Sequence, residues 1–326
     1  MRQGFEAGKK LLKGHAYAVW SARFGRCLAP GGSCANQPIG AHSVQQQGPI
    51  RLLSRDGHVV MLRQRLDLDK GPTISFERVG IKKATVFTGL CAKHDSTLFK
   101  RIDLHAVRAD DAESLFLHAY RAVLRETHVC LEFATKLQSV YRRKCDLGLV
   151  DRNVSTPEGL LAMERLIVAY ETRLYKESFD QAYLRGDLAA ISHDVLDLGE
   201  TGPCVGVSSL FSLDEVRVGD DSARVGLNVI PVAGRTLVVL SYIDRDRDAA
   251  RAWLTPILAA TGRCQRYLLS RLILERSENI VINPALYAKW SDERRKVVLR
   301  FFGGTILNND PNFDDERLNL FHQGEM

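Results

Sequence analysis

The spacing of apolar and polar positions along the 326-residue chain indicates long helices in its middle part. Between about residues 110 and 192, apolar residues recur at intervals of three, four and seven, the period of a helix with one buried face. The second stripe follows residues 155–158, Ser-Thr-Pro-Glu, which suit a helix start because a hydroxyl can cap it and proline fits its first turn. We expect two long helices that pack antiparallel as a hairpin. The first stripe comprises Phe116, Tyr120, Val123, Cys130, Ala134, Leu137 and Tyr141, and the second comprises Met163, Ile167, Tyr170 and Leu174.

From about residue 200 the pattern changes to β-rich runs separated by Gly and Asp clusters. The runs cover residues 204–211, 223–231 and 235–243, and they predict an antiparallel meander. Helical patterns follow at about 247–260, 264–276 and 284–301. Strands followed by helices indicate an α+β arrangement.

Residues 1 to about 105 are rich in Gly, Pro, Ser and Gln and predict short elements joined by loops. Strand-like runs lie at 57–62 and 84–90. We therefore expect an α+β chain in three units: an N-terminal unit, a helical hairpin, and a C-terminal antiparallel sheet with helices. Their predicted bounds are 1–107, 108–195 and 196–326.

Hydropathy and cysteine usage indicate the compartment. The longest strongly apolar run, residues 236–243, is far shorter than the roughly 20 residues of a membrane-spanning helix, and the first residues lack a signal-peptide pattern. We expect a cytoplasmic protein without a membrane partner. The seven cysteines are an odd number spread thinly along the chain, so we expect them to be reduced and to serve as core residues or metal ligands.

Charge is distributed unevenly. Residues 1–105 contain 17 Lys and Arg against 7 Asp and Glu, a net charge of +10, whereas the remainder has a net charge of −4. A basic segment attracts phosphate-rich partners, although an excess of charge is often only a solvated surface. The first third is therefore the candidate nucleic-acid interface.

Two pairs of metal-ligand residues lie in that basic third. Cys27 and Cys34 bracket Pro30-Gly31-Gly32, which lets the loop fold back, and Cys91 and His94 are spaced to lie at a helix start. Together they would complete a tetrahedral Cys₃His shell for a structural zinc ion, in the arrangement of a treble clef. The alternative is that the four residues are unrelated.

Beyond the cysteine pair, His42 lies in the run Ala-His-Ser-Val-Gln. With loop cysteines, a histidine entering a strand and a Cys-x-x-His helix in this order, residues 20–105 resemble the HNH-type (ββα-metal) nuclease domains that carry an extra structural zinc. The resemblance implies that His42 is the general base and that Asp95 is a candidate ligand for a catalytic Mg²⁺ or Mn²⁺ ion. It also implies defence against foreign DNA as a setting.

Basic residues around the motif are candidates for phosphate contacts. Together with the zinc ligands they support two hypotheses about function. The first is a zinc-stapled HNH-like nuclease that cleaves phosphodiester bonds. The second is a non-catalytic zinc-containing module that binds nucleic acid or acts as an adaptor, with the hairpin or the C-terminal unit contacting a protein partner. The candidate nucleic-acid-binding residues are Arg51, Arg55, Lys82, Lys83, Lys93, Lys100 and Arg101.

Overall fold

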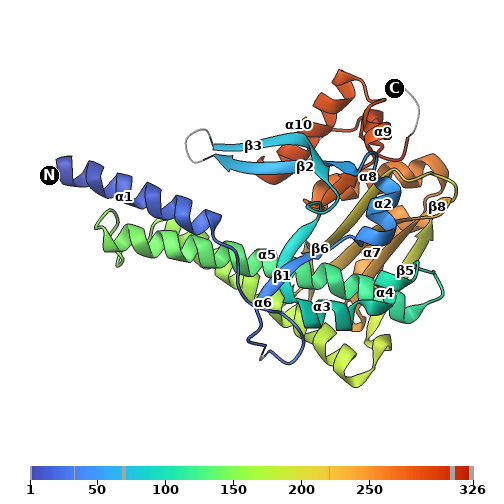
Figure 1. Ribbon diagram of the computed structural model, residues 1–326, viewed down its shortest axis with the longest axis horizontal. Coiled ribbons are helices and arrows are strands. Elements are labelled where there is room, and N and C mark those ends of the chain that lie inside the picture. Colours follow the sequence, from blue (N-terminus) through green and yellow to red (C-terminus); the bar gives the residue numbers. More distant parts are fainter. Residues whose placement is uncertain (1, 33, 68–70, 220, 309–312, 323–326) are drawn as a thin grey trace.

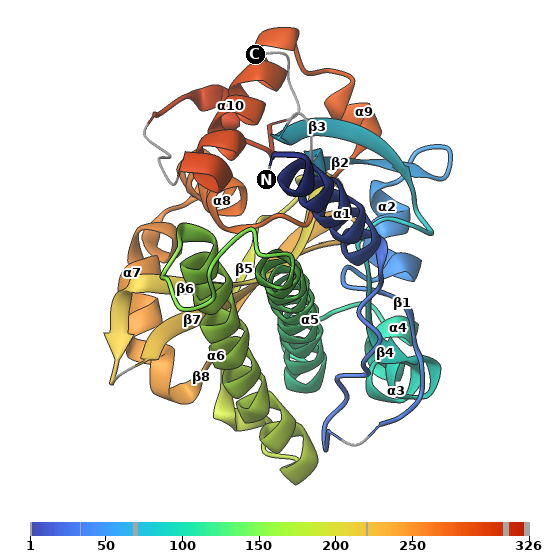
Figure 2. The same ribbon diagram turned by 90° about the vertical axis from the view of Figure 1, so that its left-hand side faces the viewer.

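The computed structural model describes residues 2–32, 34–67, 71–219, 221–308 and 313–322. It is a mixed α+β structure with antiparallel sheets, as the sequence predicts (Figures 1 and 2). Its helices are α1 (Arg2–Ser21), α2 (Arg51–Leu53), α3 (Ala92–Leu98), α4 (Lys100–Leu104), α5 (Ala112–Asp146), α6 (Pro157–Arg185), α7 (Arg247–Ala259), α8 (Gly262–Arg276), α9 (Pro284–Tyr287) and α10 (Asp292–Asn308). Its strands are β1 (Pro38–His42), β2 (His58–Asp67), β3 (Gly71–Gly80), β4 (Val86–Cys91), β5 (Ile191–Asp197), β6 (Val205–Val218), β7 (Asp221–Val232), β8 (Arg235–Ile243) and β9 (Ile280–Ile282).

A seven-stranded antiparallel sheet in the order β3-β2-β9-β6-β7-β8-β5 forms the centre of the body. The predicted meander is confirmed as β6, β7 and β8, and the first two predicted helices after it are confirmed as α7 and α8. The third prediction, about 284–301, is wrong in its extent, because a break between Tyr287 and Asp292 divides it into α9 and α10.

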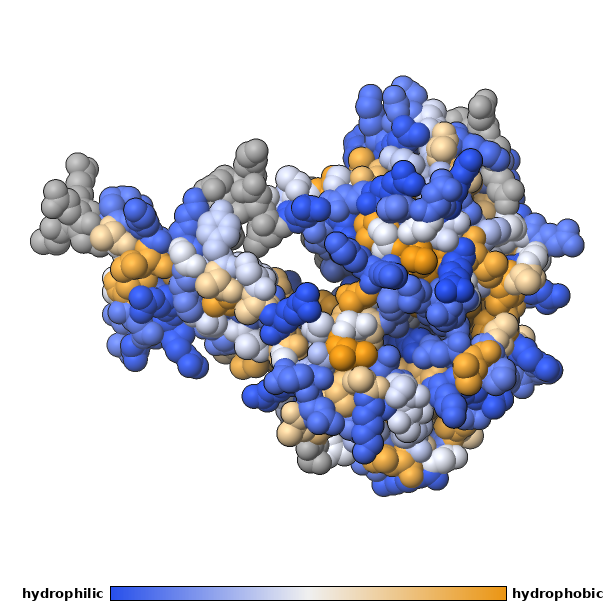
Figure 3. Space-filling view, in the orientation of Figure 1, coloured by the Kyte–Doolittle hydropathy of each residue, from blue (hydrophilic) through white to orange (hydrophobic). Residues whose placement is uncertain are grey.

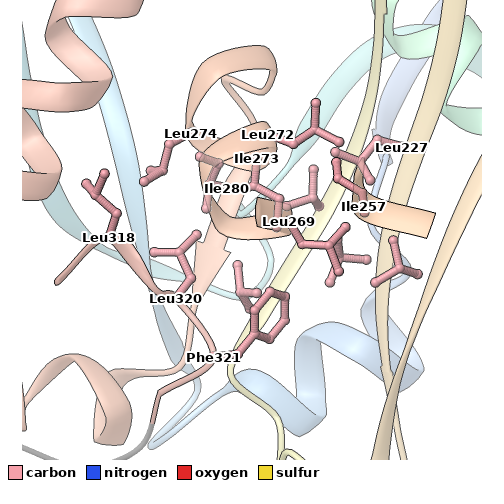
Figure 4. Close-up of a cluster of buried hydrophobic side chains, with 14 of the residues drawn as sticks. Leu227, Ile257, Leu269, Leu272, Ile273, Leu274, Ile280, Leu318, Leu320 and Phe321 are labelled. Carbon is pink, nitrogen blue, oxygen red and sulfur yellow. The ribbon is translucent and has the colours of Figure 1, made fainter. Parts of the chain in front are cut away.

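The two faces of this sheet pack against different helices. Successive residues of β8 alternate: Val238 and Leu240 belong to the core that α7, α8 and α10 cover, whereas Leu237 and Val239 pack with Leu115 of α5. Figure 4 shows part of the first core, where side chains of α7, α8 and the C-terminal segment meet those of the sheet. Strands that are buried on both faces explain why the runs 223–231 and 235–243 are almost continuously apolar.

Strands β2 and β3 join this sheet from the first third of the chain. They form a hairpin in which Val60 pairs with Arg78, and β2 also pairs with β9 through Met61 and Val281. The large sheet thus combines strands from the first and the third of the predicted units with β5, which crosses the predicted boundary at residue 195. The division at residues 107 and 195 stays a prediction.

The predicted helical hairpin corresponds to α5 and α6, which pack side by side (Figure 2). The capping signals act as expected: the Thr156 hydroxyl accepts a hydrogen bond from the Gly159 N–H at 3.2 Å, and Pro157 occupies the first turn. The helix ends at Gly186, which has a φ of +69° in the left-handed region.

The second predicted stripe is wrong about which face of α6 is buried. Met163, Ile167, Tyr170 and Leu174 are 42–57% exposed. The face that packs inward is instead made of Ala162, Ala169, Thr172, Tyr175 and Phe179. Small residues let α6 approach its neighbour closely, so spacing alone did not identify the buried side.

The expectation that the first third contains only short elements is also wrong, because α1 is a 20-residue helix. It packs along α5, where Trp20 contacts Phe133 with ring centroids 5.7 Å apart and His15 Nε2 lies 3.1 Å from the Ser139 hydroxyl. In the space-filling view this helix lies in an arm that projects from the body (Figure 3). No helix within the described ranges has the length and apolar character needed to cross a bilayer.

Candidate metal centre

The candidate metal centre is built from a small two-stranded sheet, the helix that follows it and the loop that precedes it. Strands β1 and β4 pair antiparallel, and α3 begins directly after Cys91. The loop with Cys27 docks on β4, since the Leu28 N–H donates to the Gly89 carbonyl at 2.7 Å and the Cys91 N–H donates to Cys27 Sγ at 3.3 Å. This docking brings the two predicted ligand pairs together.

The ligand atoms of Cys27, Cys34, Cys91 and His94 all lie within 4.8 Å of one another. His94 Nδ1 lies 3.4 Å from Cys27 Sγ and 3.3 Å from Cys91 Sγ, and the Sγ atoms of Cys34 and Cys91 are 3.8 Å apart. Zinc–sulfur bonds of about 2.3 Å in a tetrahedral site put sulfur atoms about 3.8 Å apart. The group is therefore close enough to hold a metal ion, and its donor set suits zinc.

The electrostatics of the thiols fit a site that binds a cation. Burial raises the pKa of Cys27, and the backbone hydrogen bonds from Cys91 and Ala29 only partly oppose this effect. At Cys91 burial acts in the same direction, but hydrogen bonds from the His94 N–H and from the neighbouring Cys34 and Cys27 thiols outweigh it and lower the pKa. A bound divalent cation would favour the thiolate form of all three cysteines.

His42 is the last residue of β1 and interacts electrostatically with Asp95 of α3. Its Nε2 is 3.0 Å from the main-chain oxygen of Ile81, and because a carbonyl oxygen only accepts, Nε2 carries the proton. Burial lowers the pKa of His42 despite this hydrogen bond. The imidazole is therefore neutral at pH 7, and its Nδ1 makes no hydrogen bond with the residues that the structure describes.

Asp95, the second candidate catalytic residue, is near enough to His42 for their charges to interact. Burial raises the pKa of Asp95, and the positive charge of Arg121 opposes that shift. Arg121 itself donates to both carboxylate oxygens of Asp103, at 3.0 and 3.2 Å. The structure thus brings His42 and Asp95 into one polar cluster beside the metal centre.

Among the described residues, the polar cluster of His42 and Asp95 does not bring three or more potential metal-ligand atoms within 4.8 Å of one another, as the Cys₃His group does. Over the described ranges, the Cys₃His set is the one group of three or more potential ligands whose atoms lie so close together. The described residues therefore give no support for the expected Mg²⁺ or Mn²⁺ ion, and its binding next to His42 stays a prediction.

All the predicted phosphate-binding residues are exposed, but they are dispersed. Arg101 is ion-paired with Asp111 at 2.8 Å and with Glu113 at 3.4 Å. Lys83 lines a cavity of about 490 Å³ on the β2–β3 hairpin, and Arg55 lines a separate one of about 410 Å³. The remaining predicted residues, Arg51, Lys82, Lys93 and Lys100, line neither cavity.

Sequence reasoning missed most of the cationic side chains that line the larger cavity, namely Arg63, Arg65 and Arg78. Arg63 and Arg65 lie two positions apart in a strand, so both point to one face of the hairpin. A search for basic residues at every second position would have found this pair.

Comparison with known proteins matched no family model, no curated protein and no solved structure. The fold and the Cys₃His group are therefore the observations from which a function has to be argued.

Proposed function

We propose that the chain is a protein that processes nucleic acid and is stabilised by a structural zinc ion. The ion would be held by Cys27, Cys34, Cys91 and His94. The small sheet and α3 would form a treble clef of HNH-like form. Support comes from the order of the elements: a ligand loop, two paired strands, and a helix that begins between the last two ligands.

In this proposal His42 is the general base for phosphodiester hydrolysis, and its hydrogen bond to Ile81 is the observation that carries the hypothesis. With the proton held on Nε2, the lone pair of Nδ1 is available to accept a proton from an attacking water. The lowered pKa keeps the ring neutral near pH 7, as a base requires.

Asp95 is the candidate to help hold a divalent ion next to His42. Such an ion, when bound, would offset the negative charge that develops on the scissile phosphate. The carboxylate of Asp95 makes no hydrogen bond with the described residues, so it is available as an oxygen ligand.

The second candidate function is a non-catalytic zinc module that binds nucleic acid or a protein partner. It is favoured because, among the described residues, His42 belongs to no group of three or more His, Cys, Asp or Glu side chains close enough to hold a metal ion. HNH-type domains also use a histidine near the end of the helix, where this chain has Phe99, which is fully buried, and Lys100.

Replacement of His42 by alanine tests the proposal, with His105→Ala as a control at an exposed histidine on the edge of α4. Wild type and both variants are incubated with plasmid, single-stranded DNA and RNA in Mg²⁺ or Mn²⁺, and zinc is measured by elemental analysis. We expect His42→Ala to keep zinc and melting temperature while cleavage falls on the order of a hundredfold or more. Equal cleavage by His42→Ala and wild type removes His42 from the mechanism, and no cleavage by wild type favours the second candidate.

A further inference from the structure

The β2–β3 hairpin carries a cationic cavity that the proposed catalytic centre does not use. The cavity has a volume of about 490 Å³ and is lined by His58, Arg63, Arg65, Glu77, Arg78 and Lys83 among others. Its residues come from both strands and from the turn after β3, and the pairing of His58 with Gly80 keeps these segments together. The cavity is therefore part of an ordered hairpin that the large sheet supports.

The charges that line this cavity are mostly positive. Glu77, the one carboxylate among the lining residues, is already bound by Arg65 through two hydrogen bonds of 2.6 and 2.8 Å. Arg63, Arg78 and Lys83 form no ion pair with any residue that the structure describes, and Arg63 Nε is a buried donor with no partner there. The buried Nε of Arg63 needs an acceptor, and the exposed side chains of Arg78 and Lys83 are free to contact an anion. The lining is thus suited to an anionic oxygen ligand.

A second cavity, of about 410 Å³, shares Glu77 and Arg78 with the first and adds aromatic surface. It is lined by Phe76 and Tyr287, whose ring centroids are 4.9 Å apart. Phe76 and Glu77 are neighbours on β3 and point to opposite faces, so the two cavities lie on opposite sides of this edge strand and meet across its edge (Figure 1). A cationic cavity and an aromatic one that meet across a strand edge match the two parts of a nucleotide, since phosphates bind arginine and bases stack on aromatic rings.

We propose that the edge of the β2–β3 hairpin binds single-stranded nucleic acid, with phosphate groups in the cationic cavity and a base against Phe76 and Tyr287. The inference deepens the nucleic-acid part of the proposed function but does not depend on zinc or on His42. A duplex would present its phosphates but not its base faces, so the aromatic cavity favours a single strand.

Binding is tested with fluorescein-labelled single-stranded DNA and RNA, the same sequence as a duplex, ATP, and inorganic phosphate, each over a range of salt concentrations. The variants are Arg63→Gln, Arg78→Gln and Tyr287→Leu. The matched control is Arg108→Gln, an exposed arginine outside both cavities that is ion-paired with Asp110.

We expect each arginine variant to weaken single-strand binding on the order of tenfold and to reduce the salt slope by about one, because each removes one phosphate contact. Tyr287→Leu should weaken binding on the order of tenfold with little change in that slope, since a stack is not ionic. Melting temperature and zinc content identify variants that merely misfold.

Unchanged affinity in folded arginine variants overturns the proposal, as does wild type that binds none of the ligands. Equal affinity for duplex and single strand, or binding of ATP and phosphate alone, overturns the single-strand assignment. Tight single-strand binding without any cleavage contradicts only the nuclease hypothesis, whereas cleavage that the cavity variants do not affect contradicts only the inference about the hairpin.

Discussion

The Sγ atoms of Cys34 and Cys91 lie 3.8 Å apart although 57 positions separate the two residues in the sequence. This separation is too long for a disulfide, whose sulfur atoms are about 2.0 Å apart, and it suits two ligands of one ion. The two cysteines are therefore not joined by a disulfide, and they lie close enough for one metal ion to connect the ligand loop to the end of β4.

Replacing Cys34 or Cys91 by serine should abolish tight zinc binding, because three ligands remain at a site whose binding free energy contributes directly to folding. We expect wild type to contain about one zinc per chain. Both variants should lose zinc and show a lower melting temperature. Cys264→Ser is the matched control, since that thiol is exposed and lies outside the ligand group. Normal zinc content and melting in both ligand variants would contradict the proposed shell.

Stability should decrease as the pH falls below 6.5, because some buried histidines stay neutral in the folded state. Burial, with a smaller effect of Arg121, lowers the pKa of His118 from 6.5 to about 3, and its Nε2 has no partner among the described residues. The unfolded chain thus binds a proton below pH 6.5 that the folded chain does not bind until about pH 3. The stabilisation is complete above pH 6.5 and is lost as the pH falls, at up to about 1.4 kcal/mol per pH unit.

Urea unfolding of wild type and His118→Phe between pH 7.5 and 5 isolates this effect, since zinc ligands and other groups titrate alike in both. We expect the difference in the free energy of unfolding to move in favour of His118→Phe as the pH falls. An equivalent variant of the exposed His105 should follow wild type. Parallel pH curves for wild type and His118→Phe would show that folding does not lower the pKa of His118.

Truncation of the exposed stripe on α6 should have little effect on stability. Ile167→Ala and Leu174→Ala remove atoms from side chains that are 49% and 42% exposed, so we expect changes within about 0.5 kcal/mol in the free energy of unfolding. Phe116→Ala on α5 is the contrast, because Phe116 is fully buried and its loss should cost about 3–5 kcal/mol. Losses of several kcal/mol at Ile167 or Leu174, measured by urea unfolding, would mean that the stripe is covered in solution.

Local patterns predicted much of this fold because they depend on neighbours in sequence. Residues that are close together in the sequence determine three such features: the caps of α6, the meander of β6 to β8, and the helix start at the Cys-x-x-His motif. The grouping of Cys27, Cys34, Cys91 and His94 was also predicted, since two pairs of metal-ligand residue types with a turn between the first two point to one shared site.

Features that depend on contacts between distant segments were not predictable in this way. Whether the α6 face with Ile167 or the face with Ala169 is buried depends on which elements pack against it, and the periodicity of the sequence is the same in either case. The cavity that contains Arg63 and Arg78 requires the register of β2 and β3. In the same way, no local signal places His42 against Ile81, which lies 39 residues further along the chain.

The pairing of β2 with β9 has a consequence for how the protein is made. Val60 lies next to Ile282 in the sheet, so the hairpin leaves the ribosome long before the strand that completes its pairing. Until then one edge of β2 exposes unpaired N–H and C=O groups, and contacts of such high sequence separation form slowly. The nascent chain therefore passes through a stage in which the metal ligands are already synthesised but the hairpin edge is open to aggregation or to a chaperone.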